Sequence, residues 1–277
     1  MMLMQAGQLG LSRRLLYPNS IPPSIVTGAT LWIDGTDSSK FFYDWDLAVP
    51  ATTDGAAIGV AINKVNSGNG MQLNSARPTL KLAAINGYSV IDFAGSTSGQ
   101  SMDSSVAGGS DNLASNIVTT TSKLLVVGVK VDAAPSAVAN PWQNKSIVGE
   151  FDGYFGLQVY DPGGGVNLTA NAYNYSGGAA QQVSVNFPKA AFVVLTYSHQ
   201  GGVLRLRVNG GTWATITSGA TALIASRLAL ARNNFAGGVT TDMELAQLAV
   251  VNTDQQDDAI AAVEQWIANQ LGLSPWW

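Results

Sequence analysis

The chain has 277 residues, a length that fits one large domain or two small ones, and it contains no cysteine, which excludes disulfides and thiolate metal sites. Charged residues make up 12% of the sequence and the formal net charge is −4, which argues against nucleic acid as a partner. No apolar run reaches the ~18 residues of a membrane span, and the apolar start precedes its basic pair, the reverse of a secretory signal.

Residues 1–27 are predicted to form an extended N-terminal arm. An apolar start is followed by a proline-rich stretch, and proline fixes the backbone in extended geometry. Because exposed apolar side chains usually mark contacts, we predict that the arm docks on another chain; a disordered terminus is the alternative. The predicted docking residues are Met1, Leu3, Met4, Leu9, Leu11, Arg13, Arg14, Leu15, Leu16 and Tyr17.

After the arm, short β-type runs alternate with turn residues, and no helix intervenes. Residues 123–131 are almost continuously apolar, which is typical of a central strand in a sandwich. Residues 191–198 and 202–208 are predicted to form a hairpin, whose exposed turn contains His199, Gln200 and Gly201. This pattern predicts an all-β fold. The predicted strands cover residues 31–34, 88–93, 123–131, 146–150, 154–160, 166–173, 182–186, 191–198, 202–208, 212–217, 227–231 and 242–251.

One helix is predicted, near the C-terminus, over residues 254–271. Thr253 and Gln256 have the spacing of a capping box, and Gly272 supplies the stop signal. Apolar residues recur on one face only, so this face should pack on the sandwich. The residues expected to point inward are Ile260, Val263 and Ile267.

The chain closes on Trp276 and Trp277, two large side chains that are costly to leave in water. We therefore count them with the docking residues. The predicted organisation is an arm over residues 1–27, a sandwich over 28–252, and a helix with a tryptophan-rich tail over 253–277, packed on the sandwich.

Six short sequence segments follow one another along the chain, at residues 30–34, 76–79, 85–95, 194–197, 204–210 and 242–252. Together they resemble the concanavalin A-like (laminin-G-like) jelly-roll domains of lectins and glucanases. The resemblance covers roughly residues 28–273 and implies a two-sheet antiparallel jelly-roll sandwich. A longer insertion at residues 47–66 departs from the family pattern.

Domains of this kind are frequent in tailed-bacteriophage virion proteins and bacterial surface proteins. The resemblance and the arm together favour a non-enzymatic virion structural protein, assembled in the host cytoplasm as a capsid decoration, tail or fibre-associated module. It would bind other virion proteins through its arm and self-associate as a homo-oligomer. The alternative is a carbohydrate-binding module that recognises host surface glycan, because the fold hosts several functions. A glycoside hydrolase is less favoured.

Catalysis is not expected, because the acidic residues do not complete a hydrolase pattern. Glycosidases need two carboxyl groups at a set separation, and glucanases that this chain resembles carry Glu-x-Asp-x-x-Glu on one strand. Here Glu150 and Asp152 fit, but Phe155 occupies the third position. The only histidine, His199, is predicted to lie in an exposed turn rather than in a catalytic triad.

No cofactor is predicted, and a histidine-based metal site is excluded by the single histidine. Calcium is an alternative, through the loop acids Asp103, Asp111, Asp152 and Asp161, although turn-capping roles suit them better. Four aromatic residues are candidates for stacking on sugar rings if they are exposed, the competing interpretation being that they belong to the core. These candidates are Trp142, Tyr173, Tyr175 and Trp213.

Overall fold

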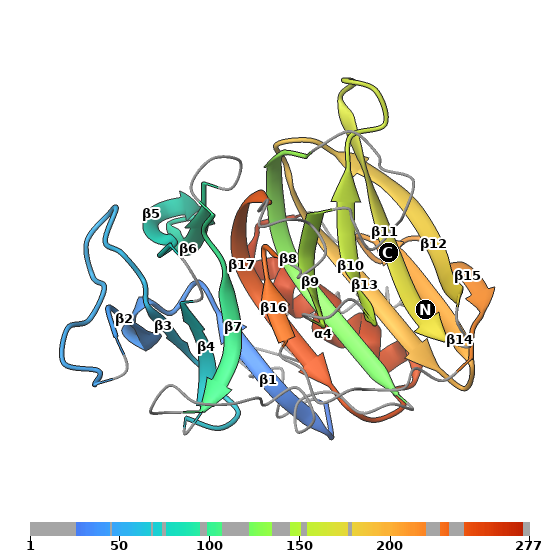
Figure 1. The fold of residues 1–277 in the computed structure, drawn as a ribbon, viewed down its shortest axis with the longest axis horizontal. Helices are drawn as coiled ribbons and strands as arrows, with labels where there is room; N and C mark the ends of the chain where they lie inside the picture. Colours follow the sequence, from blue (N-terminus) through green and yellow to red (C-terminus); the bar gives the residue numbers. More distant parts are fainter. Residues whose placement is uncertain are drawn as a thin grey trace, which may run out of the picture.

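The computed structural model describes residues 26–44, 46–67, 69–73, 76–94, 99–106, 122–134, 145–150, 154–176, 179–219, 228–232 and 241–273. Two antiparallel sheets stack face to face, and one helix packs on the outer side of the first sheet (Figure 1). The predicted all-β sandwich with a C-terminal helix is confirmed.

Sheet A has eight strands within the described ranges, in the order β15-β14-β13-β8-β17-β6-β5, with β1 also paired to β17. Its last strand in the sequence, β17, therefore lies between β8 and β6 and contacts β1 as well. The strands are β1 (Ala29–Asp34), β5 (Thr79–Ile85), β6 (Tyr88–Phe93), β8 (Lys123–Ala133), β13 (Phe192–Gln200), β14 (Val203–Val208), β15 (Ala214–Thr217) and β17 (Asp242–Val251).

Sheet B has nine strands within the same ranges, in the order β12-β11-β10-β9-β16-β7-β4-β3-β2. A short 3-10 helix, η2 (Ser38–Lys40), precedes its first strand. The strands are β2 (Phe41–Phe42), β3 (Val60–Ile62), β4 (Asn69–Leu73), β7 (Met102–Val106), β9 (Lys145–Glu150), β10 (Phe155–Tyr160), β11 (Asn167–Ser176), β12 (Ala179–Pro188) and β16 (Leu228–Leu230).

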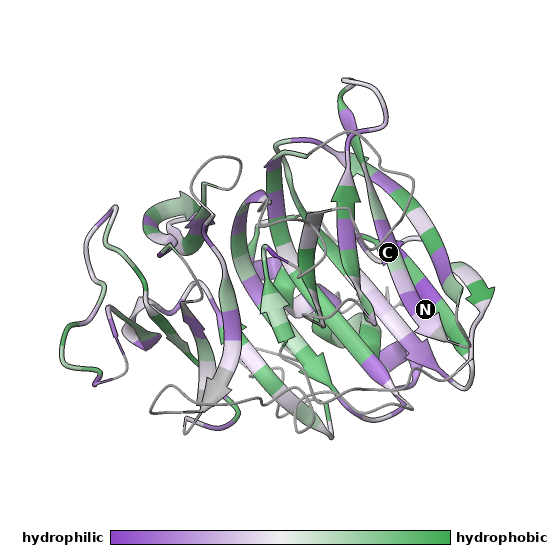
Figure 2. Cartoon of the chain, in the orientation of Figure 1, coloured by the Kyte–Doolittle hydropathy of each residue, from purple (hydrophilic) through white to green (hydrophobic). Residues whose placement is uncertain are grey.

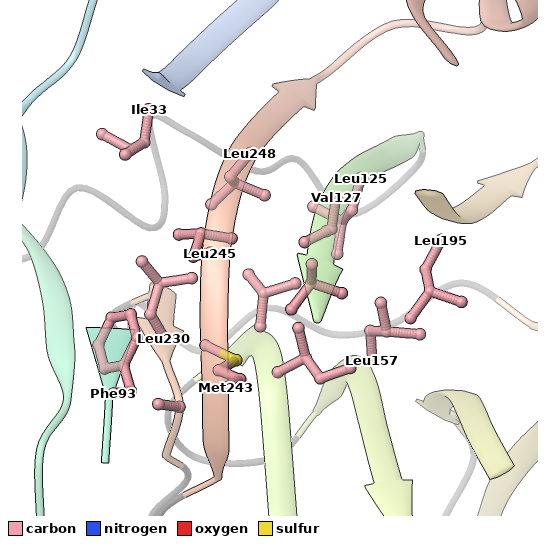
Figure 3. Packing of buried hydrophobic residues seen from close by; sticks show 14 of the residues in the cluster. Ile33, Phe93, Leu125, Val127, Leu157, Leu195, Leu230, Met243, Leu245 and Leu248 are labelled. Atoms are coloured by element: carbon pink, nitrogen blue, oxygen red, sulfur yellow. The ribbon is translucent and has the colours of Figure 1, made fainter. Parts of the chain in front are cut away.

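The main core fills the space between the two sheets (Figure 3). Successive side chains of a strand point to opposite faces, so alternate residues of each strand enter this layer. In β8 these are Leu125, Val127 and Val129, and in β10 they include Leu157. Burying each such side chain stabilises the fold by about 1.5–3 kcal/mol before the conformational entropy is subtracted.

A second core lies on the other side of sheet A, beneath α4 (Asp257–Gln270). Ile260, Val263 and Ile267 are buried there, as predicted, against Leu124 and Val126 of β8. Val26, at the end of the predicted arm, is also buried in this layer. Residues 1–25 and the tryptophan tail lie outside the described residues, so their docking stays a prediction.

The C-terminal end of α4 forms a Schellman motif around Gly272, whose φ is 62°. The amides of Gly272 and Leu273 donate to the carbonyls of Asn269 and Ala268. The prediction of a capping box at the N-terminal end of α4 was wrong. Gln256 is the N-cap residue without a side-chain cap. Thr253 lies before the helix and donates its hydroxyl to the Thr27 carbonyl at 2.8 Å, which fixes the start of the domain to its end.

Buried polar groups hold α4 and β1 in place. Arg207 makes two hydrogen bonds, of 2.8 and 2.7 Å, to the buried carboxylate of Glu264 on the helix. Burial raises the pKa of Glu264, and the neighbouring Arg207 opposes that shift. The indole of Trp32 donates to Gln247 at 2.9 Å and meets the ring of Trp266 edge-on at 5.5 Å.

The predicted exposed turn at His199 was wrong. The hairpin turn is formed by Gly201 and Gly202, whose φ values of 55° and 75° are typical of a two-residue turn between twisted strands. Strand β13 consequently continues to Gln200, and the side chain of His199 is 1% exposed. No helix among the described residues has both the length and the apolar character needed to cross a membrane.

Candidate functional site

The outward side of sheet B is polar where β9, β10, β11 and β12 lie next to one another. In β11, Ala170 and Ala172 point into the main core, so Thr169, Asn171 and Tyr173 point outward. Figure 2 shows the same alternation of hydrophobic and hydrophilic residues along β12. We call this surface the polar face. Its outward residues are Ser146, Gln158, Thr169, Asn171, Tyr173, Tyr175, Gln182, Ser184 and Asn186.

Hydrogen bonds between β11 and β12 hold the amide groups of the polar face in fixed positions. Asn171 donates to Gln182 at 2.9 Å and accepts from Ser184 at 3.1 Å, and the Thr169 hydroxyl donates to Asn186 at 2.9 Å. Gln182, Ser184 and Asn186 are exposed to solvent, so one edge of the array is open. The array is therefore an ordered set of neutral donors and acceptors.

Two buried polar side chains of the polar face have no hydrogen-bond partner. Gln158 is fully buried, and neither its amide nitrogen nor its amide oxygen is hydrogen-bonded. The hydroxyl of Ser146, which lies directly opposite on β9, is also buried without a partner. Leaving a buried amide or hydroxyl unsatisfied costs about 1–3 kcal/mol. Such groups suggest a role outside stability, since native proteins contain few of them.

Beside these groups the strands carry small residues. Gly149 and Gly156 face each other across β9 and β10, and Tyr173 lies opposite Gly156 on β11. A Cβ atom on Gly156 would come within 3.0 Å of the Tyr173 ring and 3.1 Å of the Gly149 Cα. Gly156 therefore allows the Tyr173 ring to lie close against the sheet.

Of the four residues predicted to stack on sugar rings, the three that the structure describes lie in different places and differ in burial. Tyr173 belongs to the polar face but is fully buried, because its ring packs against Gly156, so it is not free to stack on a ligand. Tyr175 is half-buried on the same face and meets Tyr154 edge-on at 6.0 Å. Trp213 packs on the helix side, with Arg205 and Arg207 over its ring at 4.5 and 4.0 Å. Trp142 lies outside the described residues.

The acids considered for calcium do not form a metal site in the part of the chain that the structure describes. No group of three or more histidine, cysteine, aspartate or glutamate side chains there could hold a metal ion. The amides of Gly163 and Gly164 donate to Asp161 and lower its pKa, so Asp161 caps a turn. Asp103 is buried on β7, Phe155 occupies the core, and Asp111 and Asp152 lie outside the described residues.

A second polar feature is an open pocket of about 490 Å³ between the β13–β14 turn and the start of α4. The side-chain amide of Gln200 in this pocket is already used within the chain, since it accepts from the backbone amide of Gln255 and donates to Ser198. Arg205 in the pocket wall is paired with Asp257 at 2.9 Å. The unsatisfied groups of the polar face make it the better candidate for a ligand.

Sequence reasoning missed the residues that form the polar face, apart from Tyr173 and Tyr175. The alternation of alanine with threonine, asparagine and tyrosine in residues 169–175 was the available signal for a polar sheet surface. Gln158 and Ser146 gave no signal, because their proximity depends on the pairing of β9 with β10.

No family model matches the chain, and no curated protein matches it. Solved structures do resemble it in fold. The binding domain of botulinum neurotoxin DC in complex with SialylT superposes with a TM-score of 0.54 at 10% identity, over 88% of this chain and 52% of that one. A structure titled for the dependence of botulinum neurotoxin type C cell entry on two ganglioside molecules gives 0.53 at 10% identity, over 87% and 51%.

A third structure, Trypanosoma rangeli sialidase in complex with 2,3-difluorosialic acid, gives a TM-score of 0.55 at 11% identity. That match covers 90% of this chain and 34% of the sialidase. The chain thus spans about half the length of the toxin structures and about a third of the sialidase. At these identities the likeness establishes the lectin-like jelly-roll fold alone.

Proposed function

We propose that the chain is a saccharide-binding module and that the polar face of β9–β12 contacts the ligand. The observation that carries the proposal is the buried, unpartnered pair of Gln158 and Ser146 within an ordered array of amides and hydroxyls. A sugar presents hydroxyl groups that donate and accept hydrogen bonds, as the amide of Gln158 does. Both side chains are buried, so a ligand would reach them only by displacing the groups that cover them, and its hydroxyl would then satisfy groups that the protein leaves without a partner.

Two further observations support this assignment. The outward residues of the polar face are uncharged, which suits a hydroxyl-rich ligand better than a strongly ionic one. The half-buried ring of Tyr175 at its edge offers an apolar surface of the kind that packs on a sugar ring. The structures that resemble this chain include a botulinum neurotoxin whose cell entry depends on two ganglioside molecules and a sialidase in complex with 2,3-difluorosialic acid.

Replacement of Gln158 by leucine tests the proposal through two measurements with opposite expected signs. Screening the wild-type protein on an array of neutral and sialylated glycans should identify a ligand. The leucine variant should then bind that ligand about tenfold more weakly, the equivalent of one lost hydrogen bond. The same variant should be as stable as the wild type or more so, because it removes an unsatisfied buried amide.

Gln256→Leu is the matched control, since this glutamine is exposed and lines the pocket beside α4 instead of the polar face. Its affinity should equal that of the wild type. A Gln158→Leu protein that loses stability and keeps its affinity would show that Gln158 serves the fold only. The absence of any ligand on the array, or loss of affinity in the control alone, would overturn the assignment to the polar face.

We propose binding without hydrolysis, because the acid pattern has Phe155 at its third position and is divided between two strands: β9 ends at Glu150, and β10 begins at Phe155, whose side chain is in the core. Purified protein should release no reducing sugar from β-glucans or bacterial polysaccharide. A turnover signal that Glu150→Gln abolishes would contradict this.

A role as a bacteriophage virion protein remains a prediction, because the arm on which it depends lies outside the described residues. The two roles are compatible, since a virion module can recognise a host surface glycan. Deleting residues 1–25 should abolish assembly onto other virion proteins while glycan binding by the polar face persists. The deletion keeps Val26, which is buried in the second core.

A further inference from the structure

One end of the main core contains two basic side chains. Lys123 begins β8 and lies directly opposite His199 near the end of β13. Both side chains share the face of Leu125 and Tyr197, which points into the space between the sheets. Lys123 is 0% exposed and His199 is 1% exposed. We call this region the basic corner.

Sheet B closes the basic corner through Phe155 of β10. The ammonium nitrogen of Lys123 lies 5.0 Å from the centroid of the Phe155 ring, and the Tyr197 ring lies 6.2 Å from the same ring. Asn174 pairs with Phe155 across β10 and β11. Its amide donates to the Ser218 hydroxyl and to the Gly219 carbonyl, both at 2.9 Å.

The charges at the basic corner depend on pH. Burial lowers the pKa of Lys123 to about 8, so its amine is charged at neutral pH. Burial also lowers the pKa of His199, Lys123 lowers it further, and the backbone carbonyls of Ser218 and Gly219 raise it. The other described titratable group that points into this corner is Tyr197, whose pKa burial raises well above its usual value; Tyr173, on the outward side of sheet B, raises it further. At neutral pH the described side chains of the corner therefore contribute one positive charge, that of Lys123.

We propose that acid opens the basic corner: His199 takes up a proton beside the buried ammonium of Lys123, and the β10–β11 end of sheet B separates from β8 and β13. The direction follows from proton linkage. The unfolded chain binds this proton near pH 6.5 and the closed corner only at lower pH, so the closed form loses stability as the pH falls below about 6.5.

The same movement reaches the polar face. Phe155 directly precedes Gly156, and Asn174 directly follows Tyr173, so the inner contacts of the corner and the contact between Gly156 and Tyr173 belong to the same strand pair. Opening at acidic pH would release a ligand held there. This last step rests on the proposed saccharide binding, whereas the opening of the corner does not.

The chain contains one histidine, which permits a direct test without ligand. Proton NMR of the imidazole ring protons gives the pKa of His199 directly, because no other histidine contributes signals. This pKa should lie below about 6.5. In Lys123→Met the pKa should move upward, because a neighbouring positive charge has been removed. Hydrogen exchange, corrected for the intrinsic pH effect, should rise about tenfold in residues 155–160 and 169–176 between about pH 7 and 5.

His199→Gln removes the titrating group and should abolish the pH-dependent exchange in these strands. Exchange in β1 and β17 serves as the internal control and should stay constant, which separates local opening from global unfolding. An unshifted His199 pKa, no pH-dependent exchange in β10 and β11, or the same dependence in His199→Gln would each overturn the proposal. If the glutamine variant does not fold, the titrations of the wild type and of Lys123→Met still decide. Failure of glycan binding would leave all these readouts unchanged.

Discussion

Replacing Lys123 by methionine should stabilise the protein at neutral pH. Burial lowers the pKa of Lys123 from 10.5 to about 8, a shift of roughly 2.5 units, and one unit corresponds to about 1.4 kcal/mol. The charged amine therefore costs about 3 kcal/mol of folding free energy. Its attraction to the Phe155 ring, worth about 1 kcal/mol, is lost in the variant. The expected net gain is about 2 kcal/mol.

The pH dependence of this gain distinguishes desolvation from improved packing. Between about pH 8 and 10.5 the unfolded chain binds more protons than the folded one, so the wild type becomes more stable as the pH rises through this window. The gain from methionine should thus be full below about pH 8 and mostly lost near pH 10. Urea unfolding followed by tryptophan fluorescence measures it.

Lys40→Met is the matched control, because Lys40 is only half-buried at the end of η2. Its effect should stay within about 0.5 kcal/mol at every pH. A Lys123→Met protein that is less stable than the wild type at neutral pH, or equally stabilised near pH 10, would refute the desolvation argument.

Three further changes test the packing of the C-terminal segment. Arg207→Met or Glu264→Met alone should each lower the free energy of unfolding by about 3–5 kcal/mol, because each leaves one buried charge without its partner. The double variant leaves no buried charge, so it should lower the free energy of unfolding by less than the sum of the two single variants. Additive effects in urea unfolding of the four proteins would contradict this. Gly272→Ala should lower the stability by about 1–2 kcal/mol in thermal denaturation, because the φ of Gly272 is 62° and a Cβ atom would lie 2.0 Å from the side-chain nitrogen of Asn86. An unchanged melting temperature would contradict the Schellman assignment. Truncation after Gly272 removes Leu273 of the Schellman motif together with Trp276 and Trp277, and should lower the melting temperature or weaken self-association on size-exclusion chromatography. A protein matching the full chain in both would show that residues 273–277 have no role.

The sequence predicts strands well where the local pattern is strong. The predicted runs at residues 88–93 and 242–251 coincide with β6 and β17, and residues 123–131 fall within β8. Strands β2, β3, β4, β5 and β7 were missed, because most of them are short and their residues alternate weakly. The insertion at residues 47–66 contains β3, so part of it extends sheet B.

The site was harder to predict than the fold, since it depends on which strands lie side by side. Ser146, Gln158 and Asn171 share one row only through the pairing of β9, β10 and β11. His199 was misplaced because the sequence His-Gln-Gly-Gly allows the turn at more than one position, and the glycine pair decided it. The capping box failed for a related reason: Thr253 found a distant partner in Thr27.

The position of β17 determines the order in which the chain can fold. This strand is synthesised after every other strand of sheet A, yet it lies between β8 and β6 and also pairs with β1, more than 200 residues earlier, where Ala29 meets Val251. Until it is synthesised, β6 and β8 present unpaired edges, which are prone to association with other chains. Sheet A can close only after β17 has been synthesised, through contacts that are slow to form because of their long sequence separation. Nascent chains should therefore remain protease-sensitive until β17 has emerged, and they should depend on chaperones to remain soluble.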